Sequence, residues 1–382
     1  MQAKARTSRP PLGAEALPGL GELIRTELAP KTADIDLNGE YPAAFMRRLG
    51  ELGGFAGAVS LAHGGQGAGL SQVIRVISQI SEECMSTGFL VWCQTACAWY
   101  LENTVNDALR ARMLPLVASG KVLAGTGLSN PMKACAAIEE VRLKAERVNG
   151  GYRINGTLPW VSNIGPGHVF ACGAGVAGEP GLLVSLVSCD APGMTLNQNA
   201  HFVALEGSNT FACQFRNVFV ADADVIAHPR EFVGFVTRIK AGFILAQMGM
   251  GVGLVRACVE MMVQSNKTLA HVNRFIDDQA EDIEQELTRV ECLTYALADA
   301  AYAQRDDARL REVLELRIAG SELALRAASA AMLHLGAKGY LLRNPAQRRL
   351  REAYFIAIVT PAIKHLKKEL YDMEHASVCC AA

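Results

Sequence analysis

Apolar residues recur at helical spacing in the first and the last third of the chain. Val73, Ile77, Ile80 and Cys84 follow one another at intervals of four, three and four residues, which places them on one helical face. The same period returns after about residue 229. Four long helices are expected there, at roughly 231–269, 276–305, 307–336 and 346–375. The pattern therefore predicts helices before residue 120 and a helical bundle near the C-terminus.

The middle third changes to the two-residue alternation that is typical of strands. Val141, Leu143 and Ala145 alternate with charged residues. Asn-Gly-Gly at 149–151 then supplies residues that tolerate positive φ, which indicates a hairpin turn. Proline and glycine punctuate the whole stretch. An antiparallel sheet or a small barrel is therefore expected from about 121 to 228.

The order of these patterns predicts an α+β protein of consecutive domains, in agreement with the length of 382 residues. We expect an N-terminal helical domain at 21–120, a middle antiparallel β-domain at 121–228 and a C-terminal four-helix bundle at 229–376. A flexible N-terminal arm at 1–20 and a tail at 377–382 are expected to flank them.

Half of the residues are apolar and the net charge is −1, so the chain suits a large core and has no global field for nucleic acid or anionic membranes. We expect neither nucleic acid nor a membrane as a partner. The longest apolar stretch, 241–255, is shorter than the roughly 20 residues of a spanning helix, which favours a buried core helix. The glycines at 249, 251 and 253 favour close helix packing.

The cysteines point to no special chemistry. Eleven are present, an odd number at irregular spacing, and the N-terminus lacks the apolar segment of a secretory signal. A reducing, cytoplasmic location is therefore expected. Cys93 and Cys97 lie one helical turn apart, but no matching pair of His or Cys residues completes a four-ligand set. No metal site is expected.

Five short motifs carry most of the functional information. In chain order they are His-Gly-Gly-Gln-Gly at 63–67, Leu-Ser-Asn-Pro at 128–131, Asn155-Gly156 leading to Trp-Val-Ser-Asn at 160–163, Gly-Ala-Lys-Gly-Tyr at 336–340, and Arg348 with Arg-Glu-Ala at 351–353. In this order and at these spacings the motifs resemble those of the acyl-CoA dehydrogenase superfamily. The resemblance covers nearly the whole chain, from about residue 20 to 370.

The resemblance implies a flavin in the cleft between the β-domain and the bundle. In the family, backbone groups of a Leu-Thr pair bind the flavin ring, and Leu128 and Ser129 stand at that place. The family's Trp and Thr near the flavin N5 correspond to Trp160 and Ser162, and an aromatic face with a hydroxyl donor suits that role. The motif at 336–340 adds further cofactor-binding candidates, Gly336 and Gly339.

FAD is the cofactor that the resemblance implies, with FMN as the alternative. The alternative arises because the family's Arg-x-x-Phe-Gly motif, which serves the flavin pyrophosphate across a subunit interface, is missing between 266 and 275. Family members pair through the C-terminal bundle, so a homodimer or homotetramer is expected.

The family's catalytic base is a glutamate in one of two places, and neither place holds one here. The common position falls at Thr360, and the second falls at Thr237, just before Arg238. An unactivated threonine hydroxyl is far too weak a base for the α-proton of a thioester. The catalytic residues therefore stay unassigned. Structural roles are expected for His334 and for Glu352, which matches a family aspartate that pairs with arginines.

Three functions are compatible with these residues. The first is a flavin-dependent oxidoreductase that acts on an acyl-CoA thioester or a related small molecule. The second is a flavin-dependent monooxygenase of the same fold, which needs no α-proton base but uses oxygen and a flavin reductase partner. The third is a non-catalytic scaffold that keeps the fold and binds a thioester, a flavin or a partner subunit without turnover.

Overall fold

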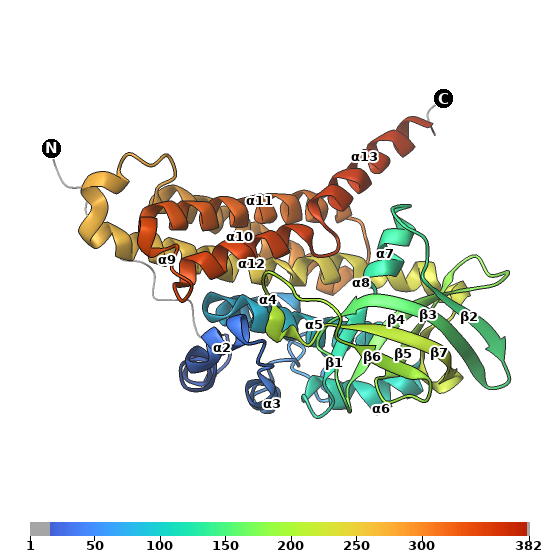
Figure 1. Ribbon diagram of the computed structural model, residues 1–382. Helices are drawn as coiled ribbons and strands as arrows, with labels where there is room; N and C mark the ends of the chain where they lie inside the picture. The colour runs from blue at the N-terminus through green and yellow to red at the C-terminus, as the bar shows by residue number, and fades with distance from the viewer. Residues whose placement is uncertain (1–15, 380–382) are drawn as a thin grey trace.

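The computed structural model describes residues 16–379, without the side chains of 376–379. Most of the expected N-terminal arm (1–15) and the end of the expected tail (380–382) lie outside the described residues. The remaining chain forms helices, then a sheet, then helices again, so the predicted α+β class is confirmed (Figure 1).

The N-terminal helices surround two long ones that lie in the core. The elements are α1 (Leu20–Leu23), α2 (Thr32–Leu37), α3 (Ala43–Glu51), α4 (Leu70–Glu83), α5 (Met85–Glu102) and α6 (Asp107–Ala118), with short 3-10 and π turns between them. The predicted apolar face of α4 is confirmed, because Val73, Ile77, Ile80 and Cys84 are all buried. Helix α5 is buried along nearly its whole length.

The middle of the chain forms one eight-stranded sheet. Its strands are β1 (Ala124–Gly127), β2 (Leu143–Val148), β3 (Gly151–Val161), β4 (Val169–Val176), β5 (Leu182–Ser188), β6 (Met194–Asn197), β7 (Phe211–Ala221) and β8 (Val225–Ala227). The strand order is β6-β7-β3-β2-β4-β5-β8, and β1 pairs with β4. The predicted hairpin at 149–150 is confirmed, since Val148 pairs with Gly151.

The sheet differs from the expected antiparallel one in two pairings. Strand β4 runs parallel to both β1 and β2, while the other strand pairs are antiparallel. The short helix α7 (Ser129–Cys135) lies in the connection from β1 to β2. Neither parallel pair joins consecutive strands, because in the sequence β2 and β3 lie between β1 and β4, and β3 lies between β2 and β4, so no tight hairpin has to connect parallel strands.

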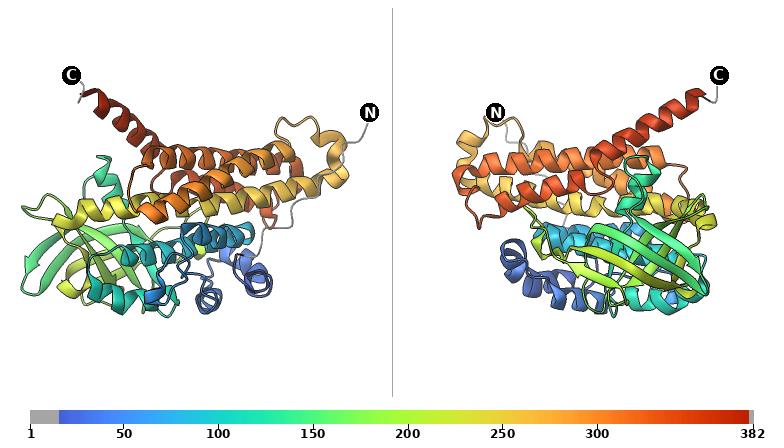
Figure 2. Two further views of the ribbon diagram at one scale, coloured as in Figure 1. Left: turned by 180° about the vertical axis from the view of Figure 1, so that it is seen from behind. Right: turned by 45° about the vertical axis from the view of Figure 1, so that its right-hand side comes forward.

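Six helices follow where four were expected. They are α8 (Phe232–Ala246), α9 (Met248–Asn273), α10 (Ala280–Gln304), α11 (Leu310–Leu335), α12 (Pro345–Ile358) and α13 (Ile363–Cys379). The first expected helix is interrupted at Gln247 and the last at 359–362. Pro361 explains the second break, because a proline lacks the N–H that an internal helical position donates. Helices α9 to α12 lie side by side, with α4 and α5 beneath them and the sheet toward one end, while α13 projects away from the bundle (Figures 1 and 2).

The apolar segment Pro229–Asn273 is long enough to cross a membrane by length and composition alone, but 89% of its most apolar window is buried inside the fold. The expected core helix is therefore confirmed, as α8 followed by α9. Close packing is confirmed at Gly249 and Gly253 but not at Gly251. A Cβ on Gly253 would lie 2.2 Å from the carbonyl oxygen of Ser78, and a Cβ on Gly249 would lie 2.8 Å from that of Ile74.

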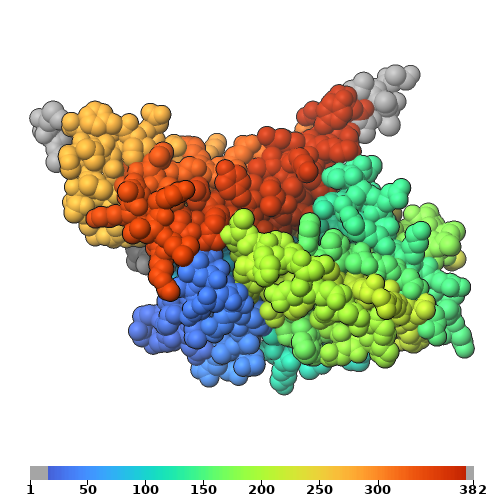
Figure 3. Space-filling view, in the orientation of Figure 1, coloured from blue at the N-terminus to red at the C-terminus, as the bar shows by residue number. Residues whose placement is uncertain are grey.

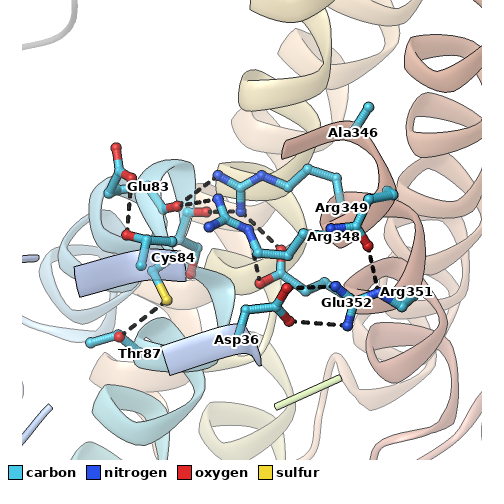
Figure 4. Close-up of polar contacts among 12 residues, drawn as sticks. Asp36, Glu83, Cys84, Thr87, Ala346, Arg348, Arg349, Arg351 and Glu352 are labelled. Carbon is cyan, nitrogen blue, oxygen red and sulfur yellow. Dashed lines mark hydrogen bonds and ion pairs between the residues drawn. The ribbon is translucent and has the colours of Figure 1, made fainter. Parts of the chain in front are cut away.

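A buried ionic network fastens α12 to the end of α4 (Figure 4). Arg349 donates to the carbonyl oxygens of Ser81 (2.9 Å) and Glu83 (3.0 Å), and Arg348 also donates to that of Glu83 (2.8 Å). Cations suit this place because the last carbonyls of a helix carry partial negative charge. Glu352 lies 3.0 Å from Arg349 and 3.8 Å from Arg348. Its expected structural role beside arginines is confirmed.

Candidate functional site

Two of the motifs meet where the sheet borders the bundle. Thr126 in β1 forms an isolated antiparallel bridge with Ser162, the residue that follows β3. Strand β1 leads through Leu128 directly into α7, whose first residue is Ser129. The predicted pair Leu128–Ser129 and the predicted Trp160–Ser162 stretch therefore end side by side, although about thirty residues separate them in the sequence.

A buried asparagine holds this junction. Asn163 lies in the left-handed region (φ 60°), and its Nδ2 donates to the carbonyl oxygen of Ala124 at 2.8 Å. Its Oδ1 accepts a hydrogen bond from the hydroxyl of Tyr41 at 2.7 Å. Gln94 of α5 accepts from the Ala124 N–H at 2.6 Å and donates to Val117 O at 2.8 Å. The N-terminal helices thus position the ends of both strands.

Trp160 presents an aromatic face to the outside. Its side chain is 59% exposed, although it stands on a central strand of the sheet. Phe202 contacts it edge to face, with the ring centroids 6.3 Å apart. Ser162, two residues further along, is half-buried, and the pairing of β3 with β7 is irregular between Leu158 and Val161. A flat ring system that needs an aromatic surface and a hydroxyl donor fits these residues.

Thr360 brings the bundle to this junction. It lies in the loop between α12 and α13, and its hydroxyl oxygen is 2.7 Å from that of Ser129. Gln247, at the break between α8 and α9, donates to the carbonyl oxygen of Thr360 at 2.8 Å. The structure thus places the first glutamate position of the family against the predicted flavin loop. Its hydroxyl is half of a hydrogen-bonded pair with Ser129.

A buried arginine supports that loop from the bundle core. Arg317 of α11 donates to Gln247 Oε1 at 3.0 Å and to Ile356 O at 2.7 Å, and it also bonds Ser321. These partners are neutral, and burial lowers the pKa of Arg317 to about 10. The side chain borders a cavity of about 10 Å³, about the volume of a single water.

The second glutamate position, Thr237, lies in α8 and not in the loop that carries Thr360. Thr237 is half-buried, and the next residue, Arg238, donates to the carbonyl oxygen of Asn103 at the end of α5 at 3.2 Å. One turn later, Lys240 carries an ion pair that the sequence did not indicate. Its Nζ lies 2.5 Å from Glu369 of α13.

Glu369 is a carboxylate close to the junction. His365 lies 2.7 Å from its second oxygen, and both side chains are largely buried. Burial opposes ionisation of Glu369, but the contacts of His365 and Lys240 outweigh it and lower the pKa of this carboxyl below its ordinary value of 4.5. Cys135, at the end of α7, lies close enough to Lys240 and Glu369 to interact with the charges of both side chains. The surfaces of α7 and α13 adjoin here (Figure 3).

The lowered pKa of Glu369 predicts an acid-sensitive contact. Its contribution to stability is complete above the ordinary pKa of 4.5 and is lost as the pH falls through the folded-state value. Glu369→Gln is therefore expected to lower the free energy of unfolding at pH 7, with a smaller effect as the pH approaches 3. Denaturant titrations across this pH range measure the difference. The exposed Glu374→Gln on the same helix is the matched control, and an equal pH dependence of both variants would contradict the assignment.

The remaining candidates lie elsewhere in the chain. Gly336 and Gly339 follow α11 at the end of the bundle farthest from the sheet, so a single chain does not bring them to Trp160 and Ser129 (Figure 1). His334, at the same end, is buried, and its ring nitrogens contact Asn266 Oδ1 and Asp278 O at 3.2 and 2.9 Å. These contacts connect α11 to α9 and to the turn before α10, which agrees with the structural role expected for His334.

Sequence reasoning missed one residue beside the junction. Thr210 directly precedes β7, and its hydroxyl oxygen lies 2.6 Å from that of Ser162. The signal was available in part, because Ser-Asn-Thr at 208–210 precedes Phe211, Cys213 and Phe215, which alternate with Ala212, Gln214 and Arg216 as in a strand. What places Thr210 beside Ser162 is the β3–β7 register, in which Val161 pairs with Phe211. Within residues 16–379, no group of three or more His, Cys, Asp or Glu side chains could hold a metal ion.

Comparison with known proteins identifies the fold family. The model of the acyl-CoA dehydrogenase N-terminal domain matches residues 19–121. Benzylmalonyl-CoA dehydrogenase of Aromatoleum aromaticum is 25% identical, over 87% of this chain and 89% of that protein. The structure of butyryl-CoA dehydrogenase from Megasphaera elsdenii superposes with a TM-score of 0.86 at 17% identity, covering 97% of this chain and 99% of that one.

A monooxygenase shares the fold as well. The structure of dibenzothiophene monooxygenase from Paenibacillus sp. A11-2 superposes with a TM-score of 0.79 at 16% identity, covering 94% of this chain and 96% of that one. The fold thus accommodates both a dehydrogenase and a monooxygenase. The family model over residues 19–121, the full-length relatives and the order of helices, sheet and bundle make this chain similar to the acyl-CoA dehydrogenase superfamily over nearly its whole length, with the fold of that superfamily.

Proposed function

We propose that this chain is a flavin-dependent oxidoreductase that acts on an acyl-CoA thioester or a related small molecule. The observation that carries the proposal is the meeting of Ser129, Trp160, Ser162 and Thr360 at one junction of sheet and bundle. The full-length dehydrogenase relative supports the same class of reaction.

Each residue has a definite task in this proposal. Trp160 covers one face of the flavin ring, backbone groups of Leu128 and Ser129 bind its edge, and Ser162 donates a hydrogen bond near N5. A bound flavin would supply the two-electron chemistry. Because Gly336 and Gly339 lie at the far end of the bundle, we assign them to the flavin of a second copy in a homodimer or homotetramer. FAD is the proposed cofactor and FMN its alternative.

Thr360 favours a flavin-dependent monooxygenase as a second candidate function. Its hydroxyl is hydrogen-bonded to Ser129, and a threonine cannot take an α-proton. A flavin-dependent monooxygenase needs no such base and would receive reduced flavin from a reductase partner. The fold shared with dibenzothiophene monooxygenase is compatible with this reading.

The visible spectrum and released cofactor of the purified protein separate these functions. Bound FAD that an acyl-CoA bleaches without oxygen supports the dehydrogenase-like reaction. Binding of reduced FMN with oxygen consumption supports the monooxygenase. A colourless protein that binds neither flavin contradicts both and leaves the non-catalytic scaffold.

Trp160→Ala tests the flavin-binding role directly. Loss of the stacking face is expected to raise the dissociation constant for FAD about tenfold or more, because stacking on an aromatic side chain is worth on the order of 1–3 kcal/mol. Flavin fluorescence titration measures the change. Tyr371→Ala removes a similarly exposed aromatic from α13 and should bind as the wild type does. Equal affinities of the two variants would remove Trp160 from the site.

A further inference from the structure

Three hydroxyl groups form a chain that ends at the proposed flavin site. The hydroxyl oxygen of Ser162 lies 2.6 Å from that of Thr210, and the Thr210 oxygen lies 2.8 Å from that of Ser208. Ser162 is half-buried beside Trp160, whereas Ser208 is only 2% exposed. The chain therefore runs from the interior of the fold outward to the junction.

Burial sets the direction of the inner hydrogen bond of this chain, between Ser208 and Thr210. A serine or threonine hydroxyl has one proton to donate and two lone pairs to accept with. If Ser162 donated inward to Thr210, and Thr210 to Ser208, the Ser208 proton would be buried without an acceptor, which is unfavourable. In the opposite direction Ser208 donates to Thr210, and Thr210 donates its own proton to Ser162 when a group outside the protein accepts the Ser162 proton. The Ser162 proton is then free to point out of the protein.

Three non-glycine residues with left-handed backbone conformation lie around the chain of hydroxyls. Asn163 (φ 60°), Leu205 (φ 67°) and Asn209 (φ 46°) all lie within a few residues of it. Such a conformation is uncommon for a leucine and persists only where its surroundings enforce it. Here the Asn163 N–H donates to Ser208 O at 3.0 Å, and the Ser208 N–H donates to Leu205 O at 3.0 Å. The fold thus holds the two loops against each other at the hydroxyl chain.

We propose that Thr210 and Ser208 are positioning residues that direct the Ser162 proton toward a bound flavin. The inference rests on the proposed flavin site and adds two residues to it. Hydrogen bonds in a chain polarise one another, so Ser162 becomes a stronger donor when it accepts from Thr210. The flavin N5 accepts such a hydrogen bond in the oxidised ring, whereas in the two-electron-reduced ring N5 carries a hydrogen of its own and no longer accepts it. The three hydroxyls together should therefore make the protein bind oxidised flavin more tightly, relative to reduced flavin.

The test compares the two oxidation states in matched variants. Dissociation constants are measured for oxidised FAD and, without oxygen, for dithionite-reduced FAD, or for FMN if the wild type prefers it. Ser162→Ala and Thr210→Val should each reduce the preference for oxidised flavin about two- to tenfold. Ser208→Ala should reduce it less, because Thr210 still donates to Ser162. Thr210→Ser restores the hydroxyl and should match the wild type.

A buried threonine far from the junction provides the control. Thr294→Val in α10 makes the same chemical change where the hydroxyl bonds only Val290 O, and it should leave the preference unchanged. A wild-type preference retained in Thr210→Val would overturn the inference while leaving the flavin site intact. If Thr210→Val does not fold, the smaller change Ser208→Ala decides, and an unchanged preference there overturns the inference as well. A wild type that binds neither flavin would instead refute the proposed function.

Discussion

Replacing Glu352 by glutamine is expected to lower the free energy of unfolding by about 3–5 kcal/mol, the usual effect of breaking a buried ion pair. Glu352 is 0% exposed, and the two arginines that it faces are buried with it (Figure 4). Without the carboxylate, Arg348 and Arg349 lose the buried anion that they share between α12 and α4, and only the more distant charges of Glu83 and Asp36 act on Arg348. The hydrogen bonds of the two arginines to the α4 carbonyls keep them in place, so they cannot reach water.

Chemical denaturation followed by helical circular dichroism measures this effect. Glu312→Gln is the matched control, because Glu312 pairs with Arg309 at 2.5 Å but on the exposed surface of α11. Surface pairs contribute little, so its denaturation midpoint should equal that of the wild type. If the two variants unfold at the same denaturant concentration, the network does not anchor α12.

The second large effect is expected at Gly253, where α9 packs against α4. Its Cβ in an alanine variant would lie 2.2 Å from Ser78 O and 2.7 Å from Ser81 Cβ. The nearer atom belongs to the α4 backbone, which cannot give way without moving the helix. Gly253→Ala is therefore expected to destabilise the fold by about 1–3 kcal/mol, despite the better helix propensity of alanine.

Gly251 provides the comparison within the same helix. A Cβ there would approach no atom closer than 3.7 Å. Gly251→Ala is thus expected to be neutral or to stabilise the helix by up to about 1 kcal/mol. Thermal unfolding of the two variants side by side measures the contrast. A Gly253→Ala protein as stable as Gly251→Ala would show that the helices are not in contact at this residue.

Much of the fold could be predicted because its signals are local. The spacing of Val73, Ile77 and Ile80 reports one helical face, and Asn149-Gly150 reports a turn, whatever the rest of the chain does. Helical spacing and turn residues gave wrong predictions where contacts between distant parts of the chain determine the structure. Leu293 shares the helical spacing of the buried Leu287, Val290 and Leu297 but is 49% exposed. The parallel pairing of β1 and β2 with β4 depends on residues far apart in the sequence.

The residues of the candidate site were likewise predicted only in part from the sequence. Motif order indicated Leu128, Ser129, Trp160 and Ser162, and the structure brings them together through the Thr126–Ser162 bridge. The contact between Ser129 and Thr360 joins positions 231 residues apart, and no local pattern reports such a distance. Thr210 was missed for the same reason. Its place beside Ser162 follows from the register of two strands and not from its neighbours in the sequence.

Hydrogen–deuterium exchange with and without FAD tests the location of the flavin site most directly. The amides of 124–131 and 158–163 form the junction of Ser129, Trp160 and Ser162, so saturating FAD is expected to slow their exchange. Bound ligand covers these groups and stabilises the local structure. Bound FAD that leaves both segments unchanged and protects other parts of the chain would contradict the site.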